Sequence, residues 1–446
     1  MKLILDSVLR VPKKEVPDWL LKAYEVRPKF GGDLFKEYQV EEDWVYFPRQ
    51  ARNMFSGFKI DDRRVEGRKI EFPPSKYREK FIGQTETIIH SMEGLLHSPC
   101  GGGVLVAGCG KGKTVMGTEL AIRLSRPTCI MVHKEYLGEQ WEEAIKMLVP
   151  DAKVGWVKQD RCDMGFDYDF VIASTQSIVS PTRVYERKFY ASFGLLILDE
   201  VHRYAADVWQ QVMWKFPTKY RLGLTATAGR FDGMWSVITD NVGPIAAELE
   251  SDPIDFQVFT VNLSTDIDSS SYDKPWLDKK MKLGKLTSLL ANHEGRNKVI
   301  TRNLVKAYKA KRKVLVLSSR RKQLDMLAVM LKREGVSADD IGFFVGGVKG
   351  KARVEVSKKQ MILATYQMAE EGLDIVELDA LFPVTPRAHV IQITGRILRA
   401  FEGKKLPSVV DLVDYKVKDL VGFSYSRRKE YESMGANIEG TIKQEG

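Results

Sequence analysis

Short apolar runs recur along this chain of 446 residues, each ending in glycine or polar residues and followed by a stretch compatible with a helix. Continuous runs of Val, Ile and Leu are typical of strands buried on both faces of a parallel sheet, with helices as crossovers. The pattern therefore predicts an α/β fold built on parallel sheets. The runs span residues 103–108, 128–133, 169–175, 194–200, 220–227, 313–319, 341–347 and 360–366.

Two breaks in this pattern predict the domain organisation. Before the double proline Pro73-Pro74 the apolar patterning is mixed, which predicts a small accessory domain over residues 1–75. Residues 249–275 are polar and carry three consecutive serines, so we expect a connection there, with some extended structure around DFQVFTV. Two lobes remain, over residues 76–248 and 276–446.

The strongest local signal is AGCGKGKT, residues 107–114, which lies between a buried strand and a helix-compatible stretch. Glycines allow such a loop to turn its backbone N–H groups toward phosphate oxygens. Lys113 would reach the β- and γ-phosphates of ATP, and the Thr114 hydroxyl would bind Mg²⁺. Lys111 either points outward or adds positive charge near the phosphates. A glycine-rich turn with a chance GKT is the alternative. The expected nucleotide-binding residues of the loop are Gly108, Gly110, Lys111, Gly112, Lys113 and Thr114.

A second signal is the apolar run GLLILDEVH, which ends in two adjacent carboxylates. Asp199 would hold Mg²⁺, and Glu200 would orient and deprotonate the attacking water. An acidic pair at a strand end is, by itself, more often a solvated helix cap. Its combination with the phosphate loop favours a site for ATP hydrolysis.

The order of these and further motifs resembles that of superfamily 2 helicases of the DExH type. DEVH resembles the DExH box, TAT at 225–227 the coupling motif, and QITGRILR at 392–399 the pattern QxxGRxxR. ATYQMAEEGLDI at 364–375 resembles the preceding motif, and Gln84 lies where these proteins read adenine. The likeness runs from about residue 76 to 400 and implies two tandem RecA-like lobes. Ala107 and Cys109 depart from the usual phosphate loop.

The resemblance also implies roles for individual residues in ATP hydrolysis. Arg396 and Arg399 would be delivered from the second lobe to the γ-phosphate, where positive charge stabilises a charge-spread transition state. His202 and Gln392 would connect the lobes across the cleft. Gly372 and Asp374 would contribute to the nucleotide site. Without the other motifs, the two arginines would be read as an exposed helix face.

Nucleic acid is expected to cross both lobes on the face away from ATP. Hydroxyls, backbone N–H groups and helix starts contact phosphates without reading bases. A polar residue at the end of a strand could equally be a helix cap or part of a turn. The short path between Gly347 and Met361 leaves the contacts of the second lobe open. The expected contacts are His133, Lys134, Thr175 and Gln176 in the first lobe and Ser319, Arg320 and Thr365 in the second.

TATAGRFDGM, residues 225–234, resembles a DNA-directed branch that includes excision-repair helicases and phage recombination helicases of the UvsW kind. That likeness implies remodelling of branched DNA, by fork unwinding and junction migration with 3′-to-5′ tracking, in replication, recombination or repair. An RNA helicase of the DExH type remains an alternative. A nucleic-acid-binding module with an inert ATPase lobe is a second, although Lys113, Glu200 and Arg396 are all intact. A third alternative is a phosphotransferase that uses the same phosphate loop, but such an enzyme would not need a second lobe with QxxGRxxR.

The formal net charge of +10 is consistent with a polyanionic partner. Residues 276–313 hold nine Lys and three Arg against two acidic residues, and form either a phosphate-facing track or a solvated helix. In the accessory domain, basic residues interleaved with aromatic ones suit contact with duplex or junction DNA, although a solvated surface is equally consistent. The arginines concerned are Arg49, Arg52, Arg63 and Arg64.

Four cysteines lack C-x2-C spacing, and no apolar run approaches the ~18 residues that span a bilayer. We therefore expect a cytoplasmic protein (in the host cytoplasm if a phage encodes it) without membrane contact. We also expect a monomer that uses ATP and Mg²⁺ and binds forks, junctions and single strands of DNA.

Overall fold

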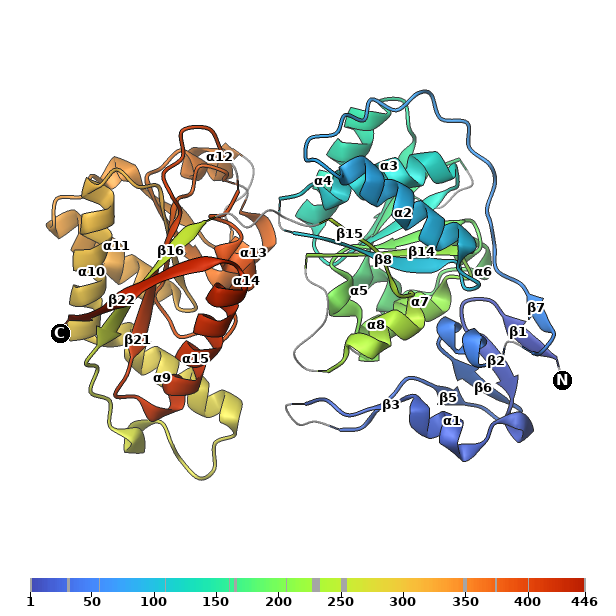
Figure 1. The fold of residues 1–446 in the computed structure, drawn as a ribbon, viewed down its shortest axis with the longest axis horizontal. Coiled ribbons are helices and arrows are strands. Elements are labelled where there is room, and N and C mark those ends of the chain that lie inside the picture. The colour runs from blue at the N-terminus through green and yellow to red at the C-terminus, as the bar shows by residue number, and fades with distance from the viewer. Residues whose placement is uncertain are drawn as a thin grey trace. The chain divides into compact units, whose positions relative to one another are not determined.

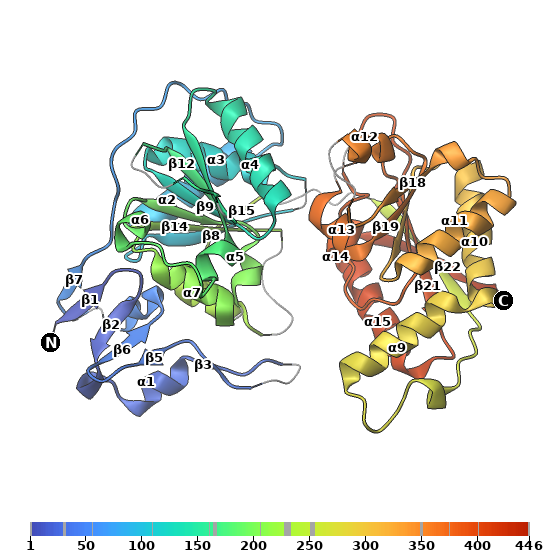
Figure 2. The same ribbon diagram turned by 180° about the vertical axis from the view of Figure 1, so that it is seen from behind.

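The computed structural model describes residues 2–444 except 30–32, 56, 109, 160, 164–166, 206, 227–232, 250–254, 348–350, 374 and 400, with the backbone alone at 207–209, 351, 370–372 and 440–444. The chain forms two compact units, residues 1–251 and 252–446 (Figures 1 and 2). Within the described residues, no helix combines the length and apolar character needed to cross a bilayer.

The main sheet of the first unit is parallel except for one edge hairpin. The predicted runs form its centre, which confirms a parallel α/β fold. Helices cover both faces, each with its own apolar core. In sheet order the strands are β11 (Arg161–Cys162), β10 (Val154–Lys158), β12 (Phe170–Ser174), β9 (Thr128–Val132), β13 (Leu195–Leu198), β14 (Tyr220–Thr225), β8 (Gly102–Ala107) and β15 (Ile245–Leu249). One face carries α2 (Gln84–His97), α3 (Lys113–Leu124) and α4 (Glu135–Leu148); the other carries α5 (Thr175–Val179), α6 (Arg187–Tyr190), α7 (Asp207–Lys215) and α8 (Trp235–Asn241).

A small amino-terminal sheet with its own core belongs to the same unit. Its strands, in sheet order, are β5 (Gln39–Val40), β6 (Trp44–Phe47), β2 (Leu9–Pro12), β1 (Leu3–Leu5) and β7 (Ile60–Asp62). Helix α1 (Asp18–Ala23) packs on it through Leu20, and β3 (Glu25–Val26) pairs with β4 (Phe35–Lys36) beside it.

Two buried arginines join the amino-terminal sheet to the main sheet. Arg49 donates hydrogen bonds to the carbonyl oxygens of Asp6, Cys100 and Thr218, the last two of which precede β8 and β14. Arg221, in β14, donates to the carbonyl oxygen of Ser7 at 2.7 Å. The amino-terminal sheet therefore holds the starting ends of two strands of the main sheet.

The second unit is a parallel sheet of seven strands. Helices α10 (Glu294–Lys309) and α11 (Arg321–Arg333) pack on one face, and α13 (Tyr366–Gly372), α14 (Ile391–Thr394) and α15 (Lys418–Ser433) on the other. Helices α9 (Lys279–Asn292) and α12 (Lys351–Ser357) complete the unit. In sheet order the strands are β18 (Ile341–Phe344), β19 (Met361–Thr365), β17 (Val314–Ser318), β20 (Ala380–Pro383), β21 (Ser408–Asp414), β16 (Phe256–Leu263) and β22 (Ala436–Gln444).

At residues 256–263 the expected connection is a strand: the extended structure expected around DFQVFTV is present, but it lies inside the sheet of the second unit. These residues form β16, which pairs in parallel with β21 on one side and β22 on the other. The segment reads as polar because Gln257, Thr260 and Asn262 interrupt its apolar residues, yet Phe256, Val258, Val261 and Leu263 are buried. The second unit thus begins with a strand inside its sheet.

Candidate functional site

The phosphate loop runs from the end of β8 to the start of α3. Gly110 and Gly112 have φ values of 78° and 79°, in the left-handed region that favours glycine. A Cβ atom at Gly112 would lie 2.6 Å from Nε2 of Gln84, so a side chain there would have to displace the Gln84 amide. The turn delivers the chain to the start of a 12-residue helix, the geometry that binds phosphate. Cys109 lies outside the described residues.

Gln84 fastens the start of α2 to this loop. Its Oε1 accepts hydrogen bonds from the backbone N–H groups of Lys80 (2.9 Å) and Phe81 (3.2 Å), and its Nε2 donates to the carbonyl of Lys111 (2.8 Å). The Lys111 ammonium lies 5.1 Å from the centroid of the Phe81 ring. Nζ of Lys113 lies against the loop, 3.0 Å from the carbonyl oxygen of Ala107.

Asp199 and Glu200 follow β13 at the same edge of the sheet. Asp199 is buried and accepts a hydrogen bond from Nε1 of Trp141 at 3.1 Å. Burial, followed by the negative charge of Glu200, raises the pKa of Asp199 to about 6. Burial would also raise the pKa of Glu200, but Lys113 and other nearby positive groups outweigh it and lower that pKa. Glu200 is therefore ionised at neutral pH, as a general base must be.

His202 links the acidic pair to the end of β14. Its Nδ1 lies 3.3 Å from Oε2 of Glu200 and 3.3 Å from Oγ1 of Thr225, where the TAT segment begins. Ala226 follows, and residues 227–232 lie outside the described residues. The expected contact between His202 and Gln392 stays a prediction.

These residues fit ATP with Mg²⁺. Asp199 offers a buried carboxylate beside the negative charge of Glu200, and oxygen ligands are those that Mg²⁺ prefers. Thr114 lies in the first turn of α3, directly after Lys113. The loop and the acidic pair both lie at the carboxyl ends of parallel strands, where such sheets bind ligands.

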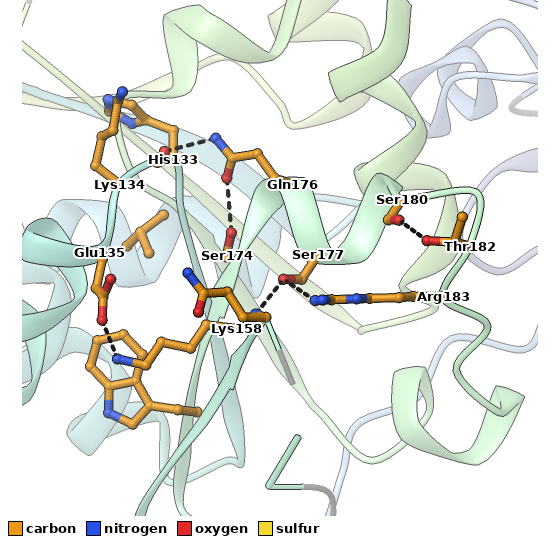
Figure 3. A pocket seen from close by; sticks show the side chains of 13 residues that line it. His133, Lys134, Glu135, Lys158, Ser174, Gln176, Ser177, Ser180, Thr182 and Arg183 are labelled. Atoms are coloured by element: carbon orange, nitrogen blue, oxygen red, sulfur yellow. Dashed lines mark hydrogen bonds and ion pairs between the residues drawn. The ribbon is translucent and has the colours of Figure 1, made fainter. Parts of the chain in front are cut away.

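A pocket of about 430 Å³ opens at the same edge, beyond β9 and β12. Three residues expected to contact nucleic acid, His133, Lys134 and Gln176, line it (Figure 3). The Gln176 side chain donates to the carbonyl of His133 (2.9 Å) and accepts from the Ser174 hydroxyl (2.8 Å). The pocket therefore has an ordered polar wall.

Two predictions for this region are wrong as direct side-chain contacts. The side chain of Thr175 is fully buried, and its hydroxyl donates to the carbonyl of Val132 (3.1 Å) and lies 2.9 Å from the Tyr204 hydroxyl. The imidazole of His133 is buried as well, and burial lowers its pKa to about 3. The Thr175 hydroxyl therefore ties the end of β9 to Tyr204, and the His133 imidazole is neutral and offers no positive charge to a phosphate.

Two basic residues of the pocket were not predicted. Lys158, at the end of β10, pairs with Glu135 and lies 4.4 Å from the centroid of the Trp156 ring. Arg183 donates to the Ser177 hydroxyl at 3.0 Å. The available signal for Lys158 was its position at the end of a short apolar strand on the same edge of the sheet. With hydroxyls of Ser180 and Thr182, the lining suits a phosphodiester.

In the second unit, the predicted contacts lie at the carboxyl ends of β17 and β19. Ser319 is exposed, and its backbone N–H donates to the Thr385 hydroxyl at 2.8 Å. The guanidinium of Arg320 donates to the hydroxyl of Ser288 (3.0 Å) and the carbonyl of Gly284 (2.9 Å), both in α9. Thr365 is half-buried immediately before α13. Arg320 therefore positions a helix.

The QITGRILR residues lie around α14 in the same unit. Gln392 is half-buried in α14, and Arg396 donates to the carbonyl of Leu373 at 2.9 Å. The backbone carbonyl of Arg399 accepts from Nζ of Lys404 at 2.8 Å. Gly372 ends α13, and Asp374 lies outside the described residues. Delivery of the two arginines to a γ-phosphate stays a prediction.

The basic surface expected on the accessory domain is largely neutralised. Arg49 is fully buried between the two sheets, so its prediction as a DNA contact is wrong. Arg64 is nearly buried and pairs with Asp62 (2.6 Å), and the more exposed Arg63 pairs with Asp61 (2.8 Å). Arg52 is half-buried. A count of charged residues along the sequence does not show that Arg63 and Arg64 each pair with the aspartate two residues earlier in the chain.

Comparisons with known proteins agree with the motifs. Residues 73–230 match the family model described as type III restriction enzyme, res subunit. A provisionally named ATP-dependent RNA helicase of Acanthamoeba polyphaga mimivirus is 31% identical over 342 residues, which are 76% of this chain and 65% of that protein. A provisionally named ATP-dependent RNA helicase of African swine fever virus is 24% identical over 431 residues, covering 90% of this chain and 82% of that protein. The chain thus spans less than two thirds of the mimivirus protein.

Solved structures share the fold. The type ISP restriction-modification enzyme LlaBIII bound to DNA covers 83% of this chain with a TM-score of 0.57 and 13% identity, over 32% of its own length. Dbp5 of S. cerevisiae bound to RNA and ADP BeF3 covers 89% with a TM-score of 0.52 and 14% identity, over 93% of its own length. T4 UvsW aligns over 99% of this chain and 100% of its own, with a TM-score of 0.41 and 15% identity. The ordered motifs, the tandem RecA-like units and the viral relatives together support a superfamily 2 helicase.

Proposed function

We propose that this chain is an ATP-dependent helicase that remodels branched DNA, unwinding forks and migrating four-way junctions, with 3′-to-5′ tracking. One observation supports the ATPase activity most directly. The side chains of Lys113, Asp199 and Glu200 lie together at one sheet edge, and His202 lies between Glu200 and Thr225. Such motors serve replication, recombination or repair.

The residues divide the chemistry of hydrolysis among them. The phosphate loop and Lys113 bind the phosphates, and Thr114 with Asp199 would hold Mg²⁺, which neutralises charge on the β- and γ-phosphates. Glu200 orients the attacking water and accepts its proton. Arg396 and Arg399 would add positive charge from the second unit.

His202 supplies the route from hydrolysis to movement. It contacts the general base on one side and the end of β14 on the other, so a change at the acidic pair shifts the TAT segment. The pocket with Lys134, Lys158 and Arg183 lies at the same sheet edge and would hold the phosphates of a strand. Contacts of this kind position a strand without reading its sequence.

DNA as the substrate is supported by the TATAGRFDGM pattern and by the match to a restriction-enzyme subunit. RNA is the second candidate, because the two viral relatives carry the name of RNA helicases. The phosphate-binding residues serve either polymer.

The deciding experiment measures ATP hydrolysis with single-stranded DNA, single-stranded RNA, forked DNA and four-way junctions. We expect forks and junctions to stimulate most, and Lys113→Ala to abolish hydrolysis while nucleotide-free DNA binding persists. Stimulation by RNA equal to or above that by DNA would replace the DNA assignment. Hydrolysis by Lys113→Ala within tenfold of the parent would remove the ATPase assignment.

A further inference from the structure

Trp276 is a large aromatic side chain held outside the core of the second unit, with 74% of its surface exposed. The turn that carries it is anchored on both sides. Tyr272 is buried with Leu286 and Leu420, and its hydroxyl donates to Asp419 at 2.6 Å. The backbone N–H of Leu277 donates to the carbonyl of Lys274 at 3.0 Å. An ordered turn thus presents an indole to solvent, where it gains nothing from burial.

The helix after this turn, α9, carries positive charge where a helix disfavours it. Lys279 and Lys280 lie in its first turn, where the macrodipole is already positive, and Lys285 follows one turn later. All three are exposed, and among the described residues no ion pair involves them, whereas Lys282 pairs with Asp273. Folding of the helix does not account for these three lysines.

The same helix adjoins a position expected to contact nucleic acid. The carbonyl of Gly284 and the hydroxyl of Ser288 accept hydrogen bonds from Arg320, which follows β17 next to the exposed Ser319. On its other side, α9 packs on the start of α15 through Leu286 and Leu290 (Figure 2). The lysines therefore project from a fixed helix that begins beside Trp276 and contacts the side chain of Arg320.

We propose that Trp276 and the three lysines form a second nucleic-acid contact, in which the indole stacks on a base where the DNA duplex opens and the lysines hold the adjoining phosphates. Exposed aromatic rings stack on any base, and lysines without acidic partners attract phosphates, so the combination fits a polyanion that presents bases. The lysine of the turn supports this chemistry, because the Lys274 ammonium lies 5.9 Å from the centroid of the indole ring. The inference rests on the proposed function for its substrate class and adds the strand-separating element.

The first test is fork binding and fork unwinding by Trp276→Ala and Trp276→Phe. Trp19→Ala is the matched control, because Trp19 is also an exposed indole, at 59%, in the amino-terminal sheet domain. We expect Trp276→Ala to weaken fork binding by about tenfold, the scale of one lost base stack, and to slow unwinding with it. ATP hydrolysis stimulated by single strands should stay within about twofold, since one stack does not alter the ATPase.

The phenylalanine variant separates stacking from folding. Trp276→Phe should keep most of the fork affinity because a ring remains, and Trp19→Ala should behave as the parent. Fork affinity of Trp276→Ala equal to that of the parent, or a loss as large in Trp276→Phe as in Trp276→Ala, overturns the proposal. Fork binding is measured without nucleotide, so a parent that hydrolyses no ATP would remove the proposed function and leave this contact standing.

The second test uses the salt dependence of DNA affinity to measure how many phosphates the three lysines contact. Replacing Lys279, Lys280 and Lys285 together by alanine should reduce the slope of log affinity against log salt by about 0.9 for each phosphate that is no longer neutralised. Alanine favours the helix and removes charge that opposes the dipole, so unfolding would not explain a weaker affinity. The control replaces Lys332, Lys358 and Lys429, which are also exposed in this unit but lie outside the basic segment 276–313. Equal changes of slope in the two triple variants overturn the assignment to α9.

Discussion

Glu200 has a φ of 51°, a left-handed conformation that a non-glycine residue rarely adopts. Backbone of this kind persists where the surrounding structure holds it, and it clusters at functional sites. Here it follows β13 directly and brings the Glu200 carboxylate to His202, while the preceding Asp199 stays buried against Trp141. Two adjacent carboxylates thus acquire opposite pKa shifts, as the separate roles proposed for them require.

Glu200→Gln keeps the side-chain shape and removes the proton acceptor. We expect ATP affinity close to that of the parent and turnover reduced by about 10²-fold or more, the scale of general-base catalysis. Nucleotide binding and single-turnover hydrolysis measure the two effects separately. Normal hydrolysis in this variant would make Glu200 a structural carboxylate.

Trp141→Phe tests the environment of Asp199. The hydrogen bond from Trp141 favours the ionised carboxylate, so its removal raises the Asp199 pKa above the present value of about 6. Binding of Mg²⁺ requires the ionised form, so the acidic limb of the ATPase profile should move to higher pH. The profile is measured at several Mg²⁺ concentrations, and an unmoved limb would separate the Trp141 bond from Asp199 ionisation.

At this scale the sequence predicted the phosphate loop and the acidic pair, because each is contiguous and its chemistry shows in the residue types. It did not predict Trp141, which lies 58 positions from its partner Asp199. It misplaced Arg49, whose burial between two sheets depends on carbonyl groups about 170 positions away. Long-range partners of this kind leave no local pattern.

At the scale of elements, apolar runs predicted eight strands because strands buried on both faces are apolar throughout. Strand β16 alternates buried and partly exposed residues, so the sequence indicated extended structure there but not a strand inside the second sheet. The amino-terminal strands β1 to β7 were missed individually, since each spans only two to four residues. Contacts between elements also escaped prediction, including a buried carboxyl at the junction of β4 and the main lobe.

That carboxyl belongs to Glu37, which is 1% exposed and has no hydrogen-bond partner for either oxygen among the described residues. Burial, followed by the charge of Asp240 in α8, raises its pKa to about 8. Because the folded-state pKa lies above the unfolded value, stability is full below about pH 4.5 and is lost as pH rises through about 8. Each pKa unit corresponds to about 1.4 kcal/mol, so ionisation of Glu37 should lower the free energy of unfolding by about a few kcal/mol.

Glu37→Gln should remove most of this dependence. Thermal unfolding of the parent should fall in temperature between pH 6 and pH 9, whereas the variant, which carries no ionisable group there, should change much less. Asp240 also titrates, with a pKa raised to about 6, so Asp240→Asn is the companion variant. Parallel curves for parent and Glu37→Gln would contradict the assignment.

At the scale of the whole molecule, the amino-terminal sheet is part of the first unit and not an appendage. Gln50 donates to the carbonyl of Val242 after α8, and Arg49 and Arg221 bind carbonyl oxygens across the two sheets. Removing the sheet leaves the Arg221 guanidinium and the apolar ends of β8 and β14 with fewer partners, and unpaired buried charge is strongly destabilising.

A chain that begins at Pro74 should therefore unfold well below the parent temperature and lose ATP hydrolysis with every DNA substrate alike. Thermal unfolding and ATPase assays measure both effects. Arg49→Met is the milder control, since it keeps the sheet and removes only the hydrogen bonds of its guanidinium. A truncated chain with parental stability and selective loss of junction activity would instead restore the accessory domain as a junction-binding module.

The position of β16 has a consequence for the order in which the protein can form during synthesis. This strand leaves the ribosome first in its unit, yet both of its neighbours, β21 and β22, come last. The amino-terminal sheet is delayed in the same way. Arg49 binds the carbonyl oxygens of Thr218 and Lys219, which are synthesised about 170 residues later. A nascent chain thus exposes a strand or an interface in each unit until the last strands of that unit have been synthesised, and the loop closures involved favour slow folding.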